Sequence, residues 1–495
     1  MELVVSERLL LTILFTIVAA PLPLLVVFLN GSWELVTAAA VVLALLVVVL
    51  LEWLRGGSDK PINFATLGLA FAAALTLCVL GGQGHFLYAN WDWITRNAVL
   101  SDLVLQPWPV VYRAADVDWL LRAPLGMYLV PAFVGKRLGV AAADYALLVQ
   151  NVLALSIIFY FLPSYLSNLR EKALVILAFV FFSGWDIVGA LLAYATTGHP
   201  LGDHLEWWAR DFQYSSAITQ IFWVPNHAIA GWSFVVAYLC WARGRASASA
   251  GFTLAMVPII SFWSPLAAIG AVPFAAYLGL RTLIDRRIGI LDVVQVALAI
   301  AAVIPMLVYT AIAAGAVPHG FVSWTPVIAL KYVTFIALEV APFVMLILWA
   351  RPNYVKDPTF LLAVALLALL PFYRVGMLND FVMRVSIPAL AFIAVILAQI
   401  GSETILRGKR SYWLAAALAT MVIGSVTGLL EIRRAFRHPV APLSPCNMIQ
   451  VTSGDHPEQK LAHYLAPMDR VPAWLSISSA PAFATEPTAA CPKID

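Results

Sequence analysis

The sequence has few charged residues for its length. Asp, Glu, Lys and Arg make up 12% of the 495 residues, whereas hydrophobic residues make up 62%. An average soluble domain has about 25% charged residues, so this composition indicates a protein that lies mostly in a membrane. The formal net charge is only +3. Such a charge gives no support to nucleic-acid binding, which requires clustered positive charge.

Several motifs are also missing. The chain contains no P-loop, no GxGxxG segment after a predicted strand and no zinc-ligand spacing. Many secondary transporters contain internal repeats. This sequence shows none. The missing nucleotide-binding motifs argue against a nucleotide-fuelled pump. The missing repeat argues against a secondary transporter.

Cysteine is scarce, with four residues in the chain. Cys78 and Cys240 lie in apolar runs, where a thiol behaves as an inert core side chain. Cys446 and Cys491 lie in a C-terminal segment rich in Pro, Ser, Ala and Thr. We expect these two cysteines to form a disulfide if the segment faces an oxidising compartment.

Many apolar runs approach or exceed the length of a bilayer span. They lie at residues 9–29, 34–54, 63–82, 143–164, 173–195, 226–242, 250–264, 266–281, 291–314, 327–350, 359–373, 383–400 and 411–430. We therefore predict an all-α polytopic membrane protein with about thirteen transmembrane helices. The short runs 250–264 and 266–281 meet at Ser264 and Pro265, so one broken or re-entrant hairpin is an alternative there.

Basic residues in short connections predict the orientation. If the spans alternate, one side carries Arg55, Lys60, Arg170, Lys172, Arg243, Arg245, Arg281, Arg286, Arg287, Arg351, Lys356, Arg407, Lys409 and Arg410. We predict that this side and the N-terminus are cytoplasmic. Lys136 and Arg137 would then lie on the outer side, against the charge rule, but they are outnumbered. The outer side then holds loops 83–142, 196–225, 315–326 and 374–382. Residues 1–430 form the transmembrane domain, and residues 431–495 form a small periplasmic C-terminal cap or tail.

The first long outer loop carries an unusual stretch, NWDWITRNAVLSDLVLQPWP, at residues 90–109. Its tryptophans favour a membrane interface. Asp92, Arg96 and Asp102 fall on one broad face of a predicted helix. The segment 119–138 is amphipathic and predicts an interfacial or re-entrant element. Other polar residues expected in outer loops or near the outer ends of spans are Asp186, His199, Asp203, His204, Glu206, Arg210, Asn226, His227, Arg374, Asp380 and Arg384.

These residue types suit phosphate-linked group transfer. A carboxylate can act as general base for an acceptor, and guanidinium groups bind phosphate and stabilise its developing charge. Asp92, with Asp102 as the second choice, is the predicted base, and Arg374, Arg384 and Arg96 are the predicted phosphate ligands. We expect sugar or acceptor contacts from His199, His204, Glu206, Arg210, His227 and Asp380. No cofactor is certain; Asp92, Asp203, Glu206 and a histidine leave a divalent metal open.

The stretches NWDWITRNAVLSDL, WPVVY, SGWDIVG and NDFVMRVSIPAL carry a family resemblance. Together with the long outer loop, they resemble the GT-C superfamily of membrane glycosyltransferases and, in particular, uncharacterised bacterial proteins near it. The resemblance covers about residues 83–400. It implies a polyprenyl-phosphate or pyrophosphate sugar donor, an extracytoplasmic active site and a catalytic aspartate in the first outer loop, at Asp92.

The sequence therefore predicts a glycosyltransferase of a bacterial inner membrane. It would move a sugar from a polyprenyl-phosphate donor to a lipid, glycan or protein acceptor on the periplasmic side. Two alternatives stay open: a transporter or flippase for an envelope lipid or polymer, and a polysaccharide polymerase or ligase. The identities of the sugar and the acceptor are left open.

Overall fold

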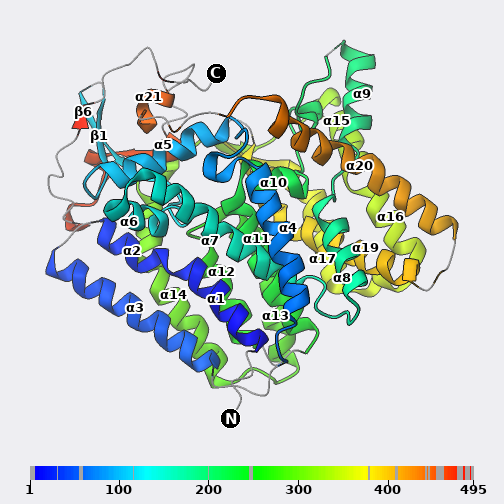
Figure 1. The fold of residues 1–495 in the computed structure, drawn as a ribbon, viewed down its shortest axis with the longest axis horizontal. Coiled ribbons are helices and arrows are strands. Elements are labelled where there is room, and N and C mark those ends of the chain that lie inside the picture. The colour runs from blue at the N-terminus through cyan, green and yellow to red at the C-terminus, as the bar shows by residue number, and fades with distance from the viewer. Residues whose placement is uncertain are drawn as a thin grey trace.

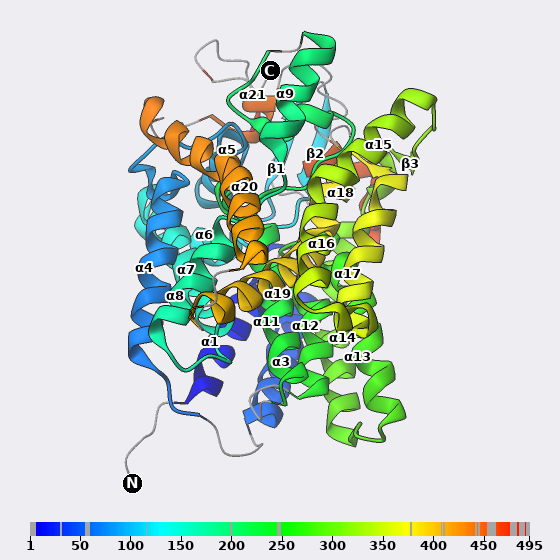
Figure 2. The same ribbon diagram turned by 90° about the vertical axis from the view of Figure 1, so that its right-hand side faces the viewer.

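The computed structural model describes residues 6–29, 32–54, 60–114, 116–198, 200–244, 249–376, 379–406, 408, 411–440, 443, 446–452, 462–475, 483–484 and 491. Most of these residues form helices that run between two ends of the molecule, as Figures 1 and 2 show. Helix α1 begins at one end. The strands β1 and β2 and the helix α5 lie at the other end, which we call the loop end.

Seven helical segments of the described chain are long and apolar enough to cross a membrane. They are α1 with α2 (Glu7–Ala19 and Pro21–Phe28), α3 (Trp33–Leu54), α7 (Val140–Phe161), α13 (Pro265–Ile284), α14 (Ile290–Ala311), α19 (Ile387–Leu406) and α20 (Tyr412–Arg437). The pair α15 (Pro326–Glu339) and α16 (Ala341–Ala350), bent by 41°, makes up to eight. By length and composition, the chain is a helical, membrane-embedded protein.

The other predicted spans form helices that are shorter or less apolar. They are α4 (Phe64–Leu80), α8 (Leu169–Val180), α9 (Asp186–Thr197), α11 (Pro225–Ala242), α12 (Ala250–Ile260) and α17 (Pro358–Leu369). A 12-residue helix is about 18 Å long, against a hydrocarbon core of about 30 Å. The described helices therefore do not establish thirteen spans.

The predicted span 173–195 is two helices rather than one. Helix α8 ends at Val180 and α9 begins at Asp186. The break between them lies against α20, because a Cβ added to Gly424 would lie 2.3 Å from the carbonyl oxygen of Ser183. The apolar run hides this break, since only the close approach of another helix requires it. In Figure 1, α9 projects at the loop end, away from α8.

The runs 250–264 and 266–281 form the separate helices α12 and α13, which pack against each other and against α11. Ser264 begins the second helix by accepting a hydrogen bond from the backbone nitrogen of Ala267 at 2.9 Å. Pro265 occupies the first turn, where a missing N–H does no harm.

The first long loop contains two helices and a hairpin. Helix α5 (Asp92–Leu105) is followed by β1 (Val111–Ala114), β2 (Val117–Leu121) and α6 (Leu129–Leu138). Within the segment 119–138, predicted as an interfacial or re-entrant element, Trp119 to Leu121 belong to β2 and the helix α6 begins only at Leu129. Pro124 disfavours a helix that would join these parts.

The C-terminal tail joins this hairpin in one sheet. Strand β5 (Leu465–Pro467) pairs antiparallel with β2, and β6 (Phe483–Ala484) pairs parallel with β1. The strand order is β5-β2-β1-β6. A second sheet pairs β3 (His319–Phe321) with β4 (Tyr373–Val375). The prediction of an all-α chain missed both sheets, because the strands are short and, apart from β1 and β2, each pairs with a strand distant in sequence.

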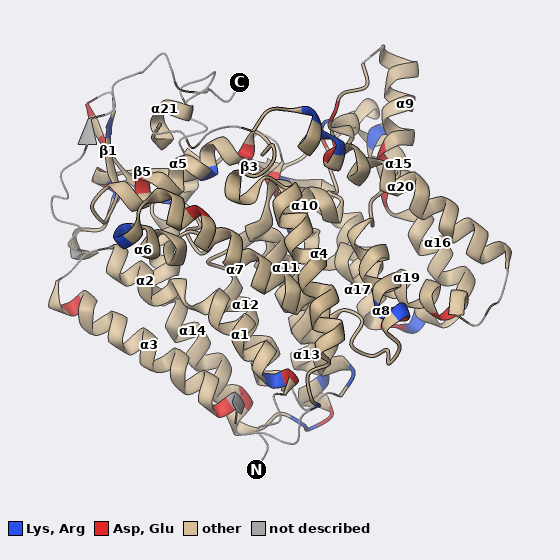
Figure 3. Ribbon diagram, viewed as in Figure 1, with Lys and Arg blue, Asp and Glu red and all other residues tan. Residues whose placement is uncertain are grey.

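Charged residues gather mainly near the ends of the helices, while the helical segments between them are mostly uncharged (Figure 3). This distribution matches the cost of placing a charge in hydrocarbon. Charged side chains therefore meet at the two ends of the helices, at the loop end and also in pairs such as Arg281 with Asp285 away from it.

Candidate functional site

Helix α5 is fixed by side chains that bind the end of α10 (Ala217–Trp223). The Nδ2 of Asn90 and the Nε1 of Trp93 donate to the carbonyl of Phe222, at 2.8 and 2.7 Å. The Nε of Arg96 donates to the carbonyl of Trp223 at 3.0 Å. The last carbonyls of a helix lack intrahelical partners, so these donors satisfy them and hold α5 in place.

Arg96 is buried, and its other guanidinium nitrogens bind neighbouring side chains. Its Nη1 donates to the Oη of Tyr128 at 3.1 Å and to the Oδ1 of Asn226 at 3.0 Å. Its Nη2 lies 3.6 Å from the Oδ2 of Asp92, one helical turn earlier. The Asp92 side chain is 39% exposed. Asp92 is thus accessible, whereas most donors of Arg96 are occupied.

A second pair of the same spacing lies on α18 (Asp380–Val385). The Nη2 of Arg384 lies 3.3 Å from the Oδ1 of Asp380, again one turn earlier. The Nε of Arg384 is buried and makes no hydrogen bond to any residue that the structure describes. Arg384 therefore has a guanidinium donor without a described partner, whereas most donors of Arg96 are occupied.

Both Asp–Arg pairs interact electrostatically with His227 and Tyr464. The charges of Arg384 and Arg96 both act on His227, whose Nδ1 lies 2.6 Å from the Oγ of Ser264. The charges of Arg96, Asp92 and Asp380 act on Tyr464, in the C-terminal tail. We call Asp92, Arg96, His227, Asp380, Arg384 and Tyr464 the Asp–Arg site. Burial raises the pKa of Tyr464, and the two aspartates raise it further against the effect of Arg96, so its hydroxyl stays protonated at neutral pH.

Arg374 lies beside this site rather than inside it. It is an exposed residue of β4, and its Nε donates to the carbonyl of Gly376 at 3.4 Å. A Cβ added to Gly376 would lie 2.8 Å from the Oδ2 of Asp380. Arg374 is therefore positioned near the rim of the Asp–Arg site.

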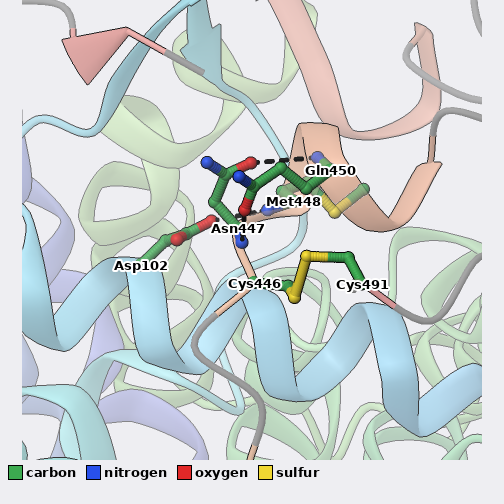
Figure 4. Close-up of a disulfide and its surroundings, with 6 residues drawn as sticks. All are labelled: Asp102, Cys446, Asn447, Met448, Gln450 and Cys491. Atoms are coloured by element: carbon green, nitrogen blue, oxygen red, sulfur yellow. Dashed lines mark hydrogen bonds between the residues drawn. A yellow bond between two sulfur atoms is a disulfide. The ribbon is translucent and has the colours of Figure 1, made fainter. Parts of the chain in front are cut away.

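Asp102 lies elsewhere on α5, under the C-terminal tail (Figure 4). Its Oδ2 accepts hydrogen bonds from the Oη of Tyr112 at 2.7 Å and from the backbone nitrogen of Met448 at 2.9 Å. Burial raises the pKa of Asp102 to about 7. Next to Met448, Cys446 forms a disulfide with Cys491, with a Cα–Cα distance of 5.9 Å. Asp102 thus attaches the tail to the first loop.

His204 and Glu206 belong to another buried cluster. The Nδ1 of His204 lies 2.7 Å from the Oε1 of Glu431 on α20, and its Nε2 lies 3.9 Å from the Oε2 of Glu206. Glu206 accepts hydrogen bonds from the backbone of Ser216 and from Gln213, both at 2.8 Å. Burial alone would lower the pKa of His204, but the two glutamates raise it above its usual value. These contacts join the segment between α9 and α10 to α20.

The remaining predicted residues are dispersed. Arg210 is exposed, and His199 lies outside the described residues. Asp203 lies 3.6 Å from Arg437 and 3.8 Å from His438. Within the described ranges, no group of three His, Cys, Asp or Glu residues is arranged to hold a metal ion. The metal ligands considered from sequence are therefore not brought together.

Sequence reasoning missed Tyr464, Tyr128 and Ser264. Tyr464 and His463 form the only adjacent His–Tyr pair in the chain, which is a weak signal. Nothing in the sequence connects this pair with α5, because its position depends on the pairing of β5 with β2.

A separate apolar groove lies between α8, α19 and α20. Its volume is about 320 Å³, and its polar lining residues are Ser402 and Ser425. It has no titratable side chain. The groove can therefore accommodate a hydrocarbon chain but not a charged head group.

The chain was compared with protein-family models, curated proteins and solved structures, and none of them matches it.

Proposed function

We propose that this chain is a GT-C-like glycosyltransferase of a bacterial inner membrane. In this proposal, it has about thirteen spans, a cytoplasmic N-terminus and a periplasmic C-terminus. It transfers a sugar from a polyprenyl-phosphate donor to a lipid, glycan or protein acceptor. The observation that carries the proposal is the Asp–Arg site, where an accessible carboxylate and a guanidinium with an unused donor come from distant parts of the chain.

The reaction assigns different roles to the two Asp–Arg pairs. Asp92 accepts the proton of the acceptor hydroxyl while the acceptor oxygen bonds to the anomeric carbon. The bond between that carbon and the phosphate oxygen breaks, and the phosphate leaves with the electron pair. Arg384, with Arg374 at the rim, stabilises the phosphate charge. Arg96 mainly positions Asp92, because its other donors hold α10, Tyr128 and Asn226.

We prefer Asp92 to Asp102 as the base. Asp102 is only 3% exposed and accepts two hydrogen bonds within the protein. An acceptor hydroxyl would have to displace the tail to reach it. The groove between α8, α19 and α20 is a place for part of the isoprenoid chain.

The test is transfer from radiolabelled polyprenyl-phosphate hexose in membranes that supply acceptors. Asp92→Asn should lower the rate at least about a hundredfold, the usual scale for loss of a general base, without lowering the thermal unfolding midpoint. Asp118→Asn is the matched control, because Asp118 lies in the same loop but pairs with Arg113 at 3.2 Å. Full activity of Asp92→Asn would refute the assignment of the base.

A transporter or flippase is the second candidate, favoured by a group of buried acids. Asp186, Glu206 and Glu339 are each no more than 2% exposed, and their charges act on one another. Buried ionisable residues within membrane proteins often mark ion or proton pathways. Binding of the donor with no sugar release would favour transport, whereas labelled product would favour the enzyme. A polymerase or ligase would instead yield product of increasing length.

A further inference from the structure

The C-terminal tail is attached to the first loop beside the Asp–Arg site. The backbone nitrogen of Arg122 donates to the carbonyl of Tyr464, and its Nη2 donates to the carbonyl of Ala462, both at 2.6 Å. Directly after Tyr464, β5 pairs with β2, with Leu465 opposite Leu121. Residues 462–467 are therefore held by both side-chain and backbone hydrogen bonds.

A second attachment restrains the tail further from the site. The buried carboxylate of Asp102 accepts a hydrogen bond from Met448, and the disulfide between Cys446 and Cys491 closes the chain around this point. A buried carboxylate and a disulfide are stronger restraints than a surface contact. The position of residues 462–467 is therefore built into the fold.

This position places His463 beside the α18 pair and Tyr464 within electrostatic range of both Asp–Arg pairs. A Cβ added to Gly376 would lie 3.0 Å from the Cε1 of His463 and 2.8 Å from the Oδ2 of Asp380. The adjacent Tyr464 lies within electrostatic range of Asp92, Arg96 and Asp380. The His463–Tyr464 dipeptide thus bridges α5 and α18.

His463 and Tyr464 supply hydrogen-bond donors that the two Asp–Arg pairs lack. Each arginine already lies near an aspartate of its own helix, so the local charges nearly balance before a ligand binds. An anionic head group then requires hydrogen-bond donors in addition to the two arginines. A tyrosine hydroxyl and an imidazole N–H can both donate.

We infer that His463 and Tyr464 bind the phosphate of the donor lipid together with Arg384, so that the C-terminal tail forms one wall of the site. This inference rests on the proposed function, because that function supplies the phosphate. It adds that the first loop and α18 form an incomplete site without the docked tail.

The test is binding of undecaprenyl phosphate to the purified full chain in detergent, compared with uncharged undecaprenol. His463→Ala and Tyr464→Phe should each weaken binding of the phosphate about tenfold, the equivalent of one or two lost hydrogen bonds. Binding of undecaprenol should stay within about twofold of the wild type, since the two residues contact only the phosphate. His438→Ala and Tyr412→Phe are matched controls, and they should not change either affinity.

The outcomes separate the inference from the proposed function. If the wild type binds the phosphate and both tail variants bind it equally well, the tail residues are not ligands and the inference fails alone. If the tail variants lose undecaprenol as strongly as the phosphate, their effect is structural and the inference also fails. If the wild type does not prefer the phosphate over undecaprenol, the proposed phosphate site is overturned.

Discussion

Two aspartates on α5 have opposite surroundings. Asp92 begins the helix with a side chain that is 39% exposed, near the guanidinium of Arg96. Asp102 lies on the same helix but is 3% exposed and accepts hydrogen bonds from Tyr112 and Met448. The chemistry of a carboxylate depends on solvent access and on its neighbours. Asp92 is therefore suited to accept a proton from a ligand, and Asp102 is suited to hold the tail.

The raised pKa of Asp102, about 7 against an ordinary 3.8, predicts a pH-dependent stability. The folded protein binds this proton more tightly than the unfolded chain does. The proton on Asp102 contributes its full stabilisation below the pKa of the unfolded chain. This stabilisation is lost as the pH rises to the folded pKa of about 7, and the stability then changes no further. The loss amounts to at most about 4 kcal/mol. Asp102→Asn should remove this part of the pH dependence, measured as the unfolding midpoint at about pH 4 and about pH 8.

Asp118→Asn is the control for the Asp102 experiment, because Asp118 is partly exposed and its partner is Arg113. That variant should keep the pH dependence of the wild type. An equal loss of stability with rising pH in the wild type and Asp102→Asn would contradict the assigned role of Asp102.

At the scale of elements, the site depends on the turn at Gly376, which follows β4. Gly376 has a φ of +77°, which only glycine adopts without strain. Asp380 and His463 lie close to Gly376, so that a Cβ there would be too near to both. The sheet of β3 and β4 leads the chain into this turn.

Gly376→Ala should therefore disturb the Asp–Arg site more than it disturbs the strand β4. The added methyl would displace Asp380 or His463, and the left-handed backbone would cost about 1–2 kcal/mol. We expect binding of undecaprenyl phosphate to weaken about tenfold. Gly320→Ala is the matched control in the paired strand, where no atom lies within 4 Å of an added Cβ. Equal affinities of the two variants would argue against a role for this turn.

At the scale of the whole molecule, α19 connects the site with the opposite end. It begins directly after α18, which carries Arg384, and its 20 residues extend about 30 Å, close to the hydrocarbon thickness of a bilayer. Phe321 in β3 lies at the same end of α19 as the Asp–Arg site. Tyr412 begins α20, after the opposite end of α19. Their side chains are 83% and 90% exposed.

These two positions test the predicted orientation. In intact spheroplasts, a membrane-impermeant thiol reagent should label Phe321→Cys but should label Tyr412→Cys only after the membrane is permeabilised. The native background should be low, because Cys78 and Cys240 are buried and the other two cysteines form the disulfide. Labelling of Tyr412→Cys alone would reverse the orientation, and labelling of both would show that the two positions share a side.

The sequence by itself determined the class of the protein and the residues worth testing. Apolar runs identify membrane helices because hydropathy is a local property. Four members of the Asp–Arg site, Asp92, Arg96, Asp380 and Arg384, stand out as charges near apolar segments. The location of two cysteines in the same tail, with the other two in apolar runs, also suggested the pair that the structure joins.

Only the tertiary structure decided how these residues are used. It divided the run 173–195 into α8 and α9, because α20 passes close to the break. It separated Asp102 from Asp92, and it brought Tyr464 to α5 through the pairing of β5 with β2. These results depend on contacts between segments distant in sequence, which leave no periodic pattern in either segment. The local sequence gives the chemistry of each side chain, and the packing of the chain gives each side chain its partners.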